Sequence, residues 1–114
     1  QGQASGDVSM TTNELIADMT DRIARDFDPL RIILFGSHAR GDATSDSDID
    51  LLVVLAEAPD QRQAAIEIRR ALRALPVSKD IVVTTPDEIA RRGDLIGPVL
   101  RPALREGKVL YERN

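Results

Sequence analysis

The sequence predicts an α/β (α+β) fold in which helices flank a mixed β-sheet. Short apolar runs rich in β-branched residues alternate with longer segments whose apolar residues recur at helical spacing. This alternation is typical of a sheet covered by helices. The length of 114 residues, with 42% hydrophobic and 30% charged residues, is that of one globular domain.

The first third of the chain predicts a helix, a strand and a second, short helix. Capping residues at 11–13 precede apolar residues at helical spacing, so we expect a helix that ends near Asp26. Asp28-Pro29 breaks this pattern, and the β-branched run 31–35, which ends at Gly36, predicts a strand. Residues 37–41 are predicted to start a short helix.

The rest of the chain predicts further strands and helices in alternation. Residues 49–55 are apolar on both faces after Asp50, as a central covered strand requires. The composition of 59–75 is helical, and this helix is expected to end before Pro76. A strand over 80–83 follows, then a capping box over 85–88 with Pro86 at the first helical position, and a helical pattern that continues through 94–106. Residues 108–112 are predicted to form an edge strand.

Composition excludes several classes of protein. We interpret the small, polar residues 1–10 as a disordered remnant of expression, and residues 11–114 as a single domain. The formal net charge of −4 argues against a nonspecific nucleic-acid binder, which needs a basic surface. No apolar run is long enough to span a bilayer, so no membrane partner is expected. The absence of cysteine excludes disulfides and thiolate metal sites and is compatible with the cytoplasmic location that we expect.

A glycine-serine turn after the first strand has the residues of a phosphate cradle. Gly36 lets the backbone approach a ligand closely, and the amides at a following helix start attract an anion. Ser37 adds a hydroxyl donor, and Arg40, about one turn further along, can reach the same phosphate. The alternative is a plain turn with a helix cap, because this pattern alone is a weak signal.

Two aspartates at the start of the central strand predict a divalent-metal site. Asp48 and Asp50 lie two residues apart, so both side chains point to one face of the strand. Their charges repel unless a cation lies between them, and Mg²⁺ prefers carboxylate, water and phosphate oxygens. If the third strand is a neighbour, its Asp80 completes the metal site or accepts a proton from an attacking hydroxyl. The alternative for Asp80 is an ordinary acid at a strand end.

Other charged residues have simpler interpretations. Asp46 is expected to solvate its loop, and His38 to be an exposed polar residue, because a lone histidine does not make a transition-metal site. Arg62, Arg69 and Arg73 form one stripe of a predicted helix, and we expect this stripe to be solvated.

Two other ligand-binding motifs can be rejected. The acids that follow Asp46 resemble a calcium loop, but Leu51 stands where the sharp turn needs glycine. The spacing of Gly36 and Gly41 resembles a nucleoside-triphosphatase loop, but Asp42-Ala43 replaces the lysine and the hydroxyl residue that such a loop requires.

The remaining motifs together resemble a known signature. Gly36-Ser37, a spacer of ten residues, aspartates at 48 and 50 and a later strand acid at 80 are similar to the signature of the DNA polymerase beta-like nucleotidyltransferase superfamily. The form Gly-Ser-His-Ala-Arg-Gly with Ser-Asp-Ser-Asp-Ile-Asp-Leu resembles its minimal nucleotidyltransferase (MNT) branch. The resemblance implies the nucleotidyltransferase fold, Mg²⁺ on Asp48 and Asp50 with Asp80 as the third acid, and ATP phosphates over Gly36 and Ser37.

The same resemblance implies a function and a partner. Members of the superfamily transfer a nucleoside monophosphate from a nucleoside triphosphate to a hydroxyl and release pyrophosphate. Minimal nucleotidyltransferases are commonly the antitoxin of a pair with a HEPT-domain toxin, so we expect AMP transfer from ATP to such a toxin. Two alternatives stay open: a binding antitoxin that keeps the acids as a relic, and a nucleotidyltransferase that modifies a small molecule such as an antibiotic.

Overall fold

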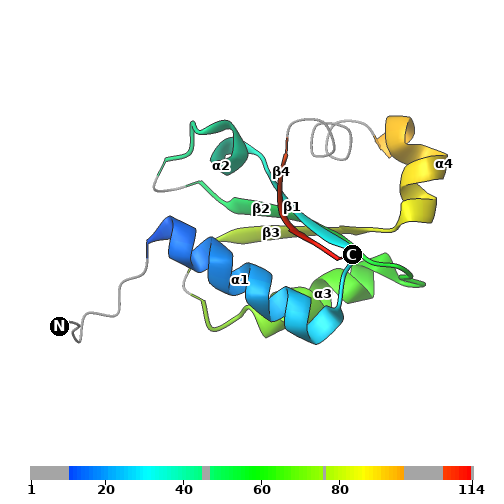
Figure 1. Cartoon of the computed structure of the whole chain (residues 1–114), viewed down its shortest axis with the longest axis horizontal. Helices are drawn as coiled ribbons and strands as arrows, with labels where there is room; N and C mark the ends of the chain where they lie inside the picture. Colours follow the sequence, from blue (N-terminus) through cyan, green and yellow to red (C-terminus); the bar gives the residue numbers. More distant parts are fainter. Residues whose placement is uncertain (1–10, 45–46, 76, 97–106, 114) are drawn as a thin grey trace.

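Four helices and four strands make up the described part of the chain. The computed structural model describes residues 11–44, 47–75, 77–96 and 107–113. The elements are coloured in chain order in Figure 1. Their bounds are α1 Thr12–Phe27, β1 Arg31–Phe35, α2 Ser37–Arg40, β2 Ile49–Val54, α3 Gln61–Ala71, β3 Lys79–Thr84, α4 Pro86–Ile96 and β4 Lys108–Glu112.

The strands form one mixed sheet in the order β3-β2-β1-β4. β1 pairs antiparallel with β2 and with β4, and β2 pairs parallel with β3. The predicted mixed sheet flanked by helices is therefore confirmed. β2 is an interior strand and β4 lies at an edge, as the sequence predicts.

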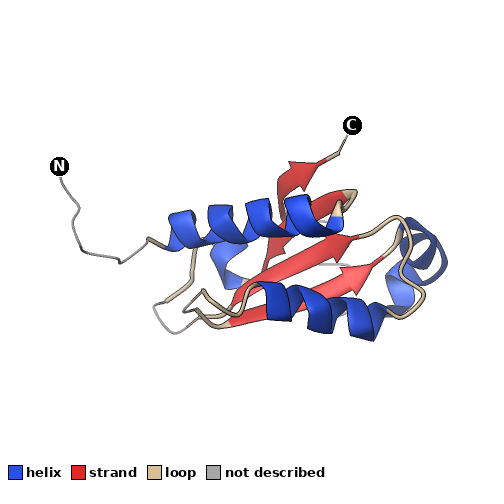
Figure 2. Cartoon of the chain, turned by 90° about the horizontal axis from the view of Figure 1, so that it is seen from below, coloured by secondary structure: helices blue, strands red, loops and turns tan. Residues whose placement is uncertain are grey.

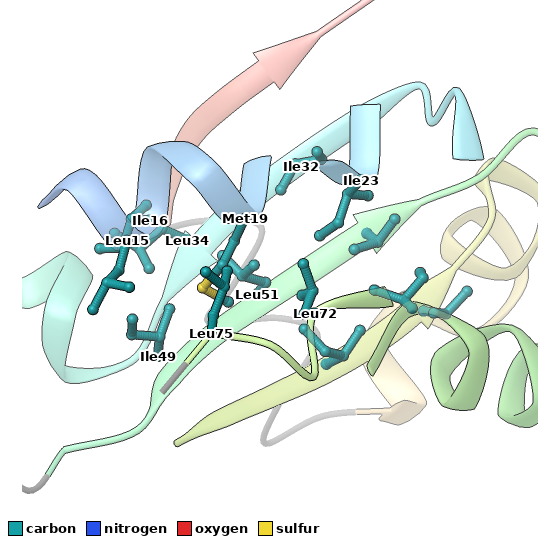
Figure 3. Packing of buried hydrophobic residues seen from close by; sticks show 14 of the residues in the cluster. Leu15, Ile16, Met19, Ile23, Ile32, Leu34, Ile49, Leu51, Leu72 and Leu75 are labelled. Atoms are coloured by element: carbon teal, nitrogen blue, oxygen red, sulfur yellow. The ribbon is translucent and has the colours of Figure 1, made fainter. Parts of the chain in front are cut away.

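The helices lie on both sides of this sheet, and the larger core is on the side of α1 and α3 (Figure 2). Met19 and Ile23 of α1 and Ile68 of α3 are completely buried there, against Leu51 and other residues of the strands. Figure 3 shows Met19 and Ile23 pointing from α1 toward the sheet. The opposite face carries a smaller buried cluster of Ile33, Leu52 and Val54, with Ile89 of α4 packed against it.

The alternation of side chains along β2 assigns its residues to the two faces. Ile49, Leu51 and Val53 belong to the core under α1 and α3, whereas Leu52 and Val54 belong to the cluster on the other face. Asp50 shares the face of Leu52 by the same alternation. This aspartate therefore lies on the side of the sheet away from α1 and α3.

The helix termini follow the predicted caps. Thr11 and Glu14 form a complete capping box at the start of α1. Thr85 Oγ1 accepts a hydrogen bond from the backbone N–H of Glu88 (3.1 Å), and α4 begins at Pro86. The helical pattern over 94–106 continues to residue 96; residues 97–106, like residues 1–10, lie outside the described part of the chain.

The predicted helix over 59–75 is too long at both ends. The side chain of Asp60 caps Gln63, so α3 begins at Gln61, and regular helix ends at Ala71. Beyond it, backbone N–H groups bond carbonyls three residues earlier, as between Leu75 and Leu72 (3.0 Å).

None of the described helices is long and apolar enough to cross a membrane.

The packing of α3 can be tested with two isoleucines on the same helix. Ile68→Ala empties a fully buried position, so the free energy of unfolding should fall by about 2–5 kcal/mol in urea denaturation. Ile66 is 41% exposed, and Ile66→Ala is the matched control with an expected loss below about 1 kcal/mol. Equal losses would contradict the described orientation of α3.

Candidate active site

The turn between β1 and α2 has a backbone conformation that favours glycine. Gly36 has φ +75° and ψ −156°, a region that other residues rarely occupy. Its carbonyl oxygen accepts hydrogen bonds from the backbone N–H groups of Ala39 and Arg40, both at 3.1 Å. Gly41 ends α2 in the left-handed region. The predicted turn and short helix are thus confirmed.

Gly36 lies directly against the carboxylate of Asp50. Phe35 is the register partner of Asp50 in the antiparallel pair of β1 and β2, so the next residue of the turn crosses over the aspartate. A Cβ atom at Gly36 would collide with Asp50 Oδ2 and would lie 3.1 Å from its Cγ. The two sequence motifs therefore meet in space, and the glycine provides the room for the carboxylate.

Asp80 lies beside Asp50 on the neighbouring strand. β2 and β3 are parallel, and Asp50 and Asp80 are direct register partners. Side chains of register partners point to the same face of a sheet. Asp48, which is exposed, precedes β2 by one residue. The expected adjacency of the second and third strands is confirmed, and one face of the sheet carries Asp50 and Asp80.

The surroundings of Asp50 make ionisation of its carboxyl group less favourable. Burial raises the pKa of Asp50, and the charges of Asp80 and Asp48 raise the pKa further. His38 and Arg40 act in the opposite direction and lower the pKa of this carboxyl group. The net effect is a raised pKa, for which burial is the largest cause and the two neighbouring negative charges are the next.

Two neighbouring side chains, Arg40 and His38, have specific contacts. Arg40 Nε lies 3.3 Å from Asp42 Oδ2, so Arg40 is paired within its own loop. His38 is half-buried rather than exposed, and its Nε2 lies 3.4 Å from the carbonyl oxygen of Ser47. Sequence reasoning missed the charge effect of this histidine on Asp50, although its place next to Ser37 was a signal.

Asp80 has a partner that the sequence did not reveal. Arg69 Nη2 of α3 donates a hydrogen bond to Asp80 Oδ1 at 2.9 Å. The sequence predicts that Arg69 belongs to a solvated stripe. Its side chain is 54% exposed, as expected for such a stripe, but it also forms an ion pair with Asp80. The two residues are eleven positions apart on different elements, and no sequence pattern marks such a contact.

The donor set fits a hard cation. In the described ranges, no three His, Cys, Asp or Glu side chains are already gathered closely enough to hold a metal ion. However, Asp48 and Asp50 offer carboxylate oxygens of the kind that Mg²⁺ prefers. Burial raises the pKa of Asp50 most, and a cation would offset the charges of Asp80 and Asp48 that raise it further. The assignment of Asp48, Asp50 and Asp80 as metal ligands stays a prediction.

Two cavities lie beside α2, and neither is lined by Gly36, Ser37 or the three aspartates. A cavity of about 420 Å³ lies between α1, β1 and β4, and another of about 400 Å³ lies between α1 and the loop after α2. His38 lines both cavities. Their volumes are in the range of small-ligand sites.

Gly36 and Gly41 provide a matched test of the contact with Asp50. Both have positive φ, but a Cβ at Gly41 meets nothing within 4 Å. Gly41→Ala should cost about 1 kcal/mol of stability through backbone strain alone. Gly36→Ala adds the collision with Asp50, so we expect a loss of at least about 2–3 kcal/mol in urea denaturation. Similar losses for both variants would contradict the described contact.

The raised pKa of Asp50 predicts how stability depends on pH. Because the folded protein binds this proton more tightly than the unfolded chain does, the wild type loses stability as pH rises through the raised pKa. Asp50→Asn removes this loss, so in metal-free buffer it should be the more stable protein at neutral pH, and the gap should shrink in acid. Urea denaturation across the acidic range measures the gap.

The exposed α1 residue Asp26 provides the control for this experiment, since Asp26→Asn also removes one negative charge. A stability gap between Asp50→Asn and the wild type that does not change with pH would contradict the assigned electrostatics.

Comparison with known proteins identifies relatives of this chain. The family model described as the nucleotidyltransferase domain matches residues 16–110. A protein of Methanocaldococcus jannaschii, named as a protein adenylyltransferase, is 28% identical over 112 residues, which cover 90% of this chain and 73% of that protein.

Solved structures share the fold. A chain in the crystal structure of a toxin-antitoxin with AMP-PNP superposes with a TM-score of 0.63 at 26% identity, covering 86% of this chain and 74% of that chain. A nucleotidyltransferase structure from Sulfolobus solfataricus gives a TM-score of 0.61 at 22% identity, covering 87% and 78% of the two chains, and supports the fold alone. Because the family match covers most of the chain, including the glycine-serine turn, Asp48, Asp50 and Asp80, the chain belongs to the nucleotidyltransferase domain family.

Proposed function

We propose that this protein transfers AMP from ATP, in a Mg²⁺-dependent reaction, to a hydroxyl group on a HEPT-type toxin and thereby acts as its antitoxin. The observation that carries the proposal is the contact between Gly36 and the Asp50 carboxylate, with Asp80 in register beside it. A glycine backbone that a phosphate can approach closely thus lies next to carboxylates that can bind the metal ions of a triphosphate.

The residues take separate roles in this proposal. Gly36 and Ser37 bind the phosphates of ATP. Arg40 also binds a phosphate, through a charge-assisted hydrogen bond. Its ion pair with Asp42 is exposed and therefore weak, so Arg40 can exchange Asp42 for the phosphate. Asp48, Asp50 and Asp80 would hold Mg²⁺, which offsets the charge of the triphosphate and of the departing pyrophosphate.

The transfer step itself is a displacement at phosphorus. The acceptor hydroxyl oxygen forms a bond to the α-phosphorus of ATP, and the bond from this phosphorus to the bridging oxygen of the β-phosphate breaks. Pyrophosphate leaves with the electron pair of that bond. The proton of the hydroxyl passes to Asp80 if this half-exposed carboxylate is not bound to the metal ion, and otherwise to water.

Relatives support the choice of nucleotide and partner. The M. jannaschii relative is named as a protein adenylyltransferase, and the toxin-antitoxin structure contains AMP-PNP, an analogue of ATP. Both observations favour an adenine nucleotide and a protein acceptor for this chain. The HEPT class of the toxin comes from the resemblance of the motifs to minimal nucleotidyltransferases.

Labelled ATP tests the proposal directly. With Mg²⁺ and the candidate toxin, label at the α-phosphate should appear on the toxin, and label at the γ-phosphate should not. Asp48→Asn and Asp50→Asn should lower the rate about 100-fold or more, because several kcal/mol of charge stabilisation are lost. Asp26→Asn, on exposed α1 surface, should retain the wild-type rate.

Other outcomes separate the alternatives. Transfer of the γ-label would identify a kinase and contradict the proposal. Full neutralisation of the toxin in cells by the double variant Asp48→Asn/Asp50→Asn would instead identify a binding antitoxin. Transfer to an aminoglycoside hydroxyl, with none to the toxin, would identify a small-molecule nucleotidyltransferase.

A further inference from the structure

The pair of Arg69 and Asp80 links a helix on one side of the sheet to the acidic face on the other. Ile68 of α3 is buried in the core beneath the sheet, and the next residue, Arg69, reaches Asp80. β3 is an edge strand, so a long side chain from α3 can pass around it. Asp80 itself lies in register with Asp50. The guanidinium thus approaches the acids from the edge of the sheet.

The contact occupies only one oxygen of the carboxylate. Arg69 Nη2 lies 2.9 Å from Asp80 Oδ1, and within the described part of the chain Oδ2 makes no hydrogen bond. A carboxylate accepts from both oxygens, so the second one stays available to another partner. The half-exposed carboxylate leaves room for that partner (52% exposed).

The guanidinium also offsets a repulsion within the site. Asp50 and Asp80 carry like charges on one face, and the charge of Asp80 acts on Asp50 more strongly than that of Asp48 does. This effect of Asp80 on Asp50 is present while Asp80 is bound to Arg69. Without the guanidinium at Oδ1, repulsion between the carboxylates would favour orientations in which Asp80 points away from the other two acids.

We propose that Arg69 is a positioning residue for the third acid: it holds the Asp80 carboxylate beside Asp50 through Oδ1 and leaves Oδ2 for the metal ion or for the proton of the acceptor hydroxyl. The inference rests on the proposed function, because it assumes that Asp80 serves the transfer reaction. It assigns a role to one residue of a stripe that otherwise looks like ordinary helix surface.

Neighbouring arginines provide matched controls. Arg70 and Arg73 are exposed, adjoin the same cleft of about 430 Å³, and make no ion pair within the described ranges. They share the charge and surroundings of Arg69 but not its contact. An effect of Arg69 through Asp80 should therefore be absent in Arg70→Gln and Arg73→Gln.

The test combines kinetics with metal binding. Arg69→Gln should lower kcat about 10- to 100-fold, as the loss of an outer partner of a metal ligand does, and should leave KM for ATP within about twofold. Titration calorimetry with Mg²⁺ and a non-hydrolysable ATP analogue should show metal affinity weakened about tenfold. Arg69→Lys, which keeps the positive charge, should lower kcat and Mg²⁺ affinity less than Arg69→Gln does. The melting temperature should not change, because exposed ion pairs contribute little to stability.

A double variant distinguishes action through Asp80 from other roles. In an Asp80→Asn background, Arg69→Gln should have no further effect on kcat or on Mg²⁺ affinity. A raised KM for ATP with unchanged Mg²⁺ affinity would overturn the proposal and identify a phosphate contact. Equal effects of Arg69→Gln, Arg70→Gln and Arg73→Gln would overturn it in favour of a general basic surface.

The metal-binding measurement separates this inference from the proposed function. If the wild type transfers no nucleotide but Arg69→Gln still weakens Mg²⁺ binding with Arg70→Gln unaffected, the proposed reaction fails and the positioning of Asp80 stands. If the wild type is active and Arg69→Gln matches it in kcat and in Mg²⁺ affinity, the positioning role is excluded and the reaction stands.

Discussion

The close approach of the Gly36 backbone to the Asp50 carboxylate is the constraint on which the site depends. β1 and β2 must pair in one register for the turn after Phe35 to pass over Asp50. Only a residue without a side chain fits there, and its backbone occupies a region that other residues avoid. Parallel pairing of β2 with β3 then adds Asp80 at the same level. Two strand pairings and one glycine thus bring together residues from three separate segments.

Charge in this site opposes folding, and apolar packing elsewhere offsets it. Burial raises the pKa of Asp50, and the charges of Asp80 and Asp48 raise it further. The nearby positive groups are His38 and Arg40, which act on Asp50, and Arg69, which is paired with Asp80. The larger core under α1 and α3 lies on the opposite side of the strands, so it stabilises the sheet without covering the acids.

Much of this arrangement could be predicted from local patterns in the sequence. The features that could not be predicted depend on contacts between residues that are distant in the sequence. Apolar runs and caps predicted the strands and helix starts, because these signals involve neighbouring residues. The end of α3 at Ala71 was missed, since Leu72 and Leu75 stay buried in turns and preserve the apolar pattern. The pairing of Arg69 with Asp80 was missed because an arginine on a helix surface has the same local pattern whether or not it has a partner.

The alternation along β2 has a consequence for how the chain finds its native pairing. Leu51 is completely buried on one face, and Asp50 belongs to the other. A shift of this strand by one residue would exchange them, placing an ionised carboxylate in an apolar interior and a leucine in water. The charge of Asp50 therefore also disfavours misaligned pairing of β2, in addition to the role that we propose for it in the site.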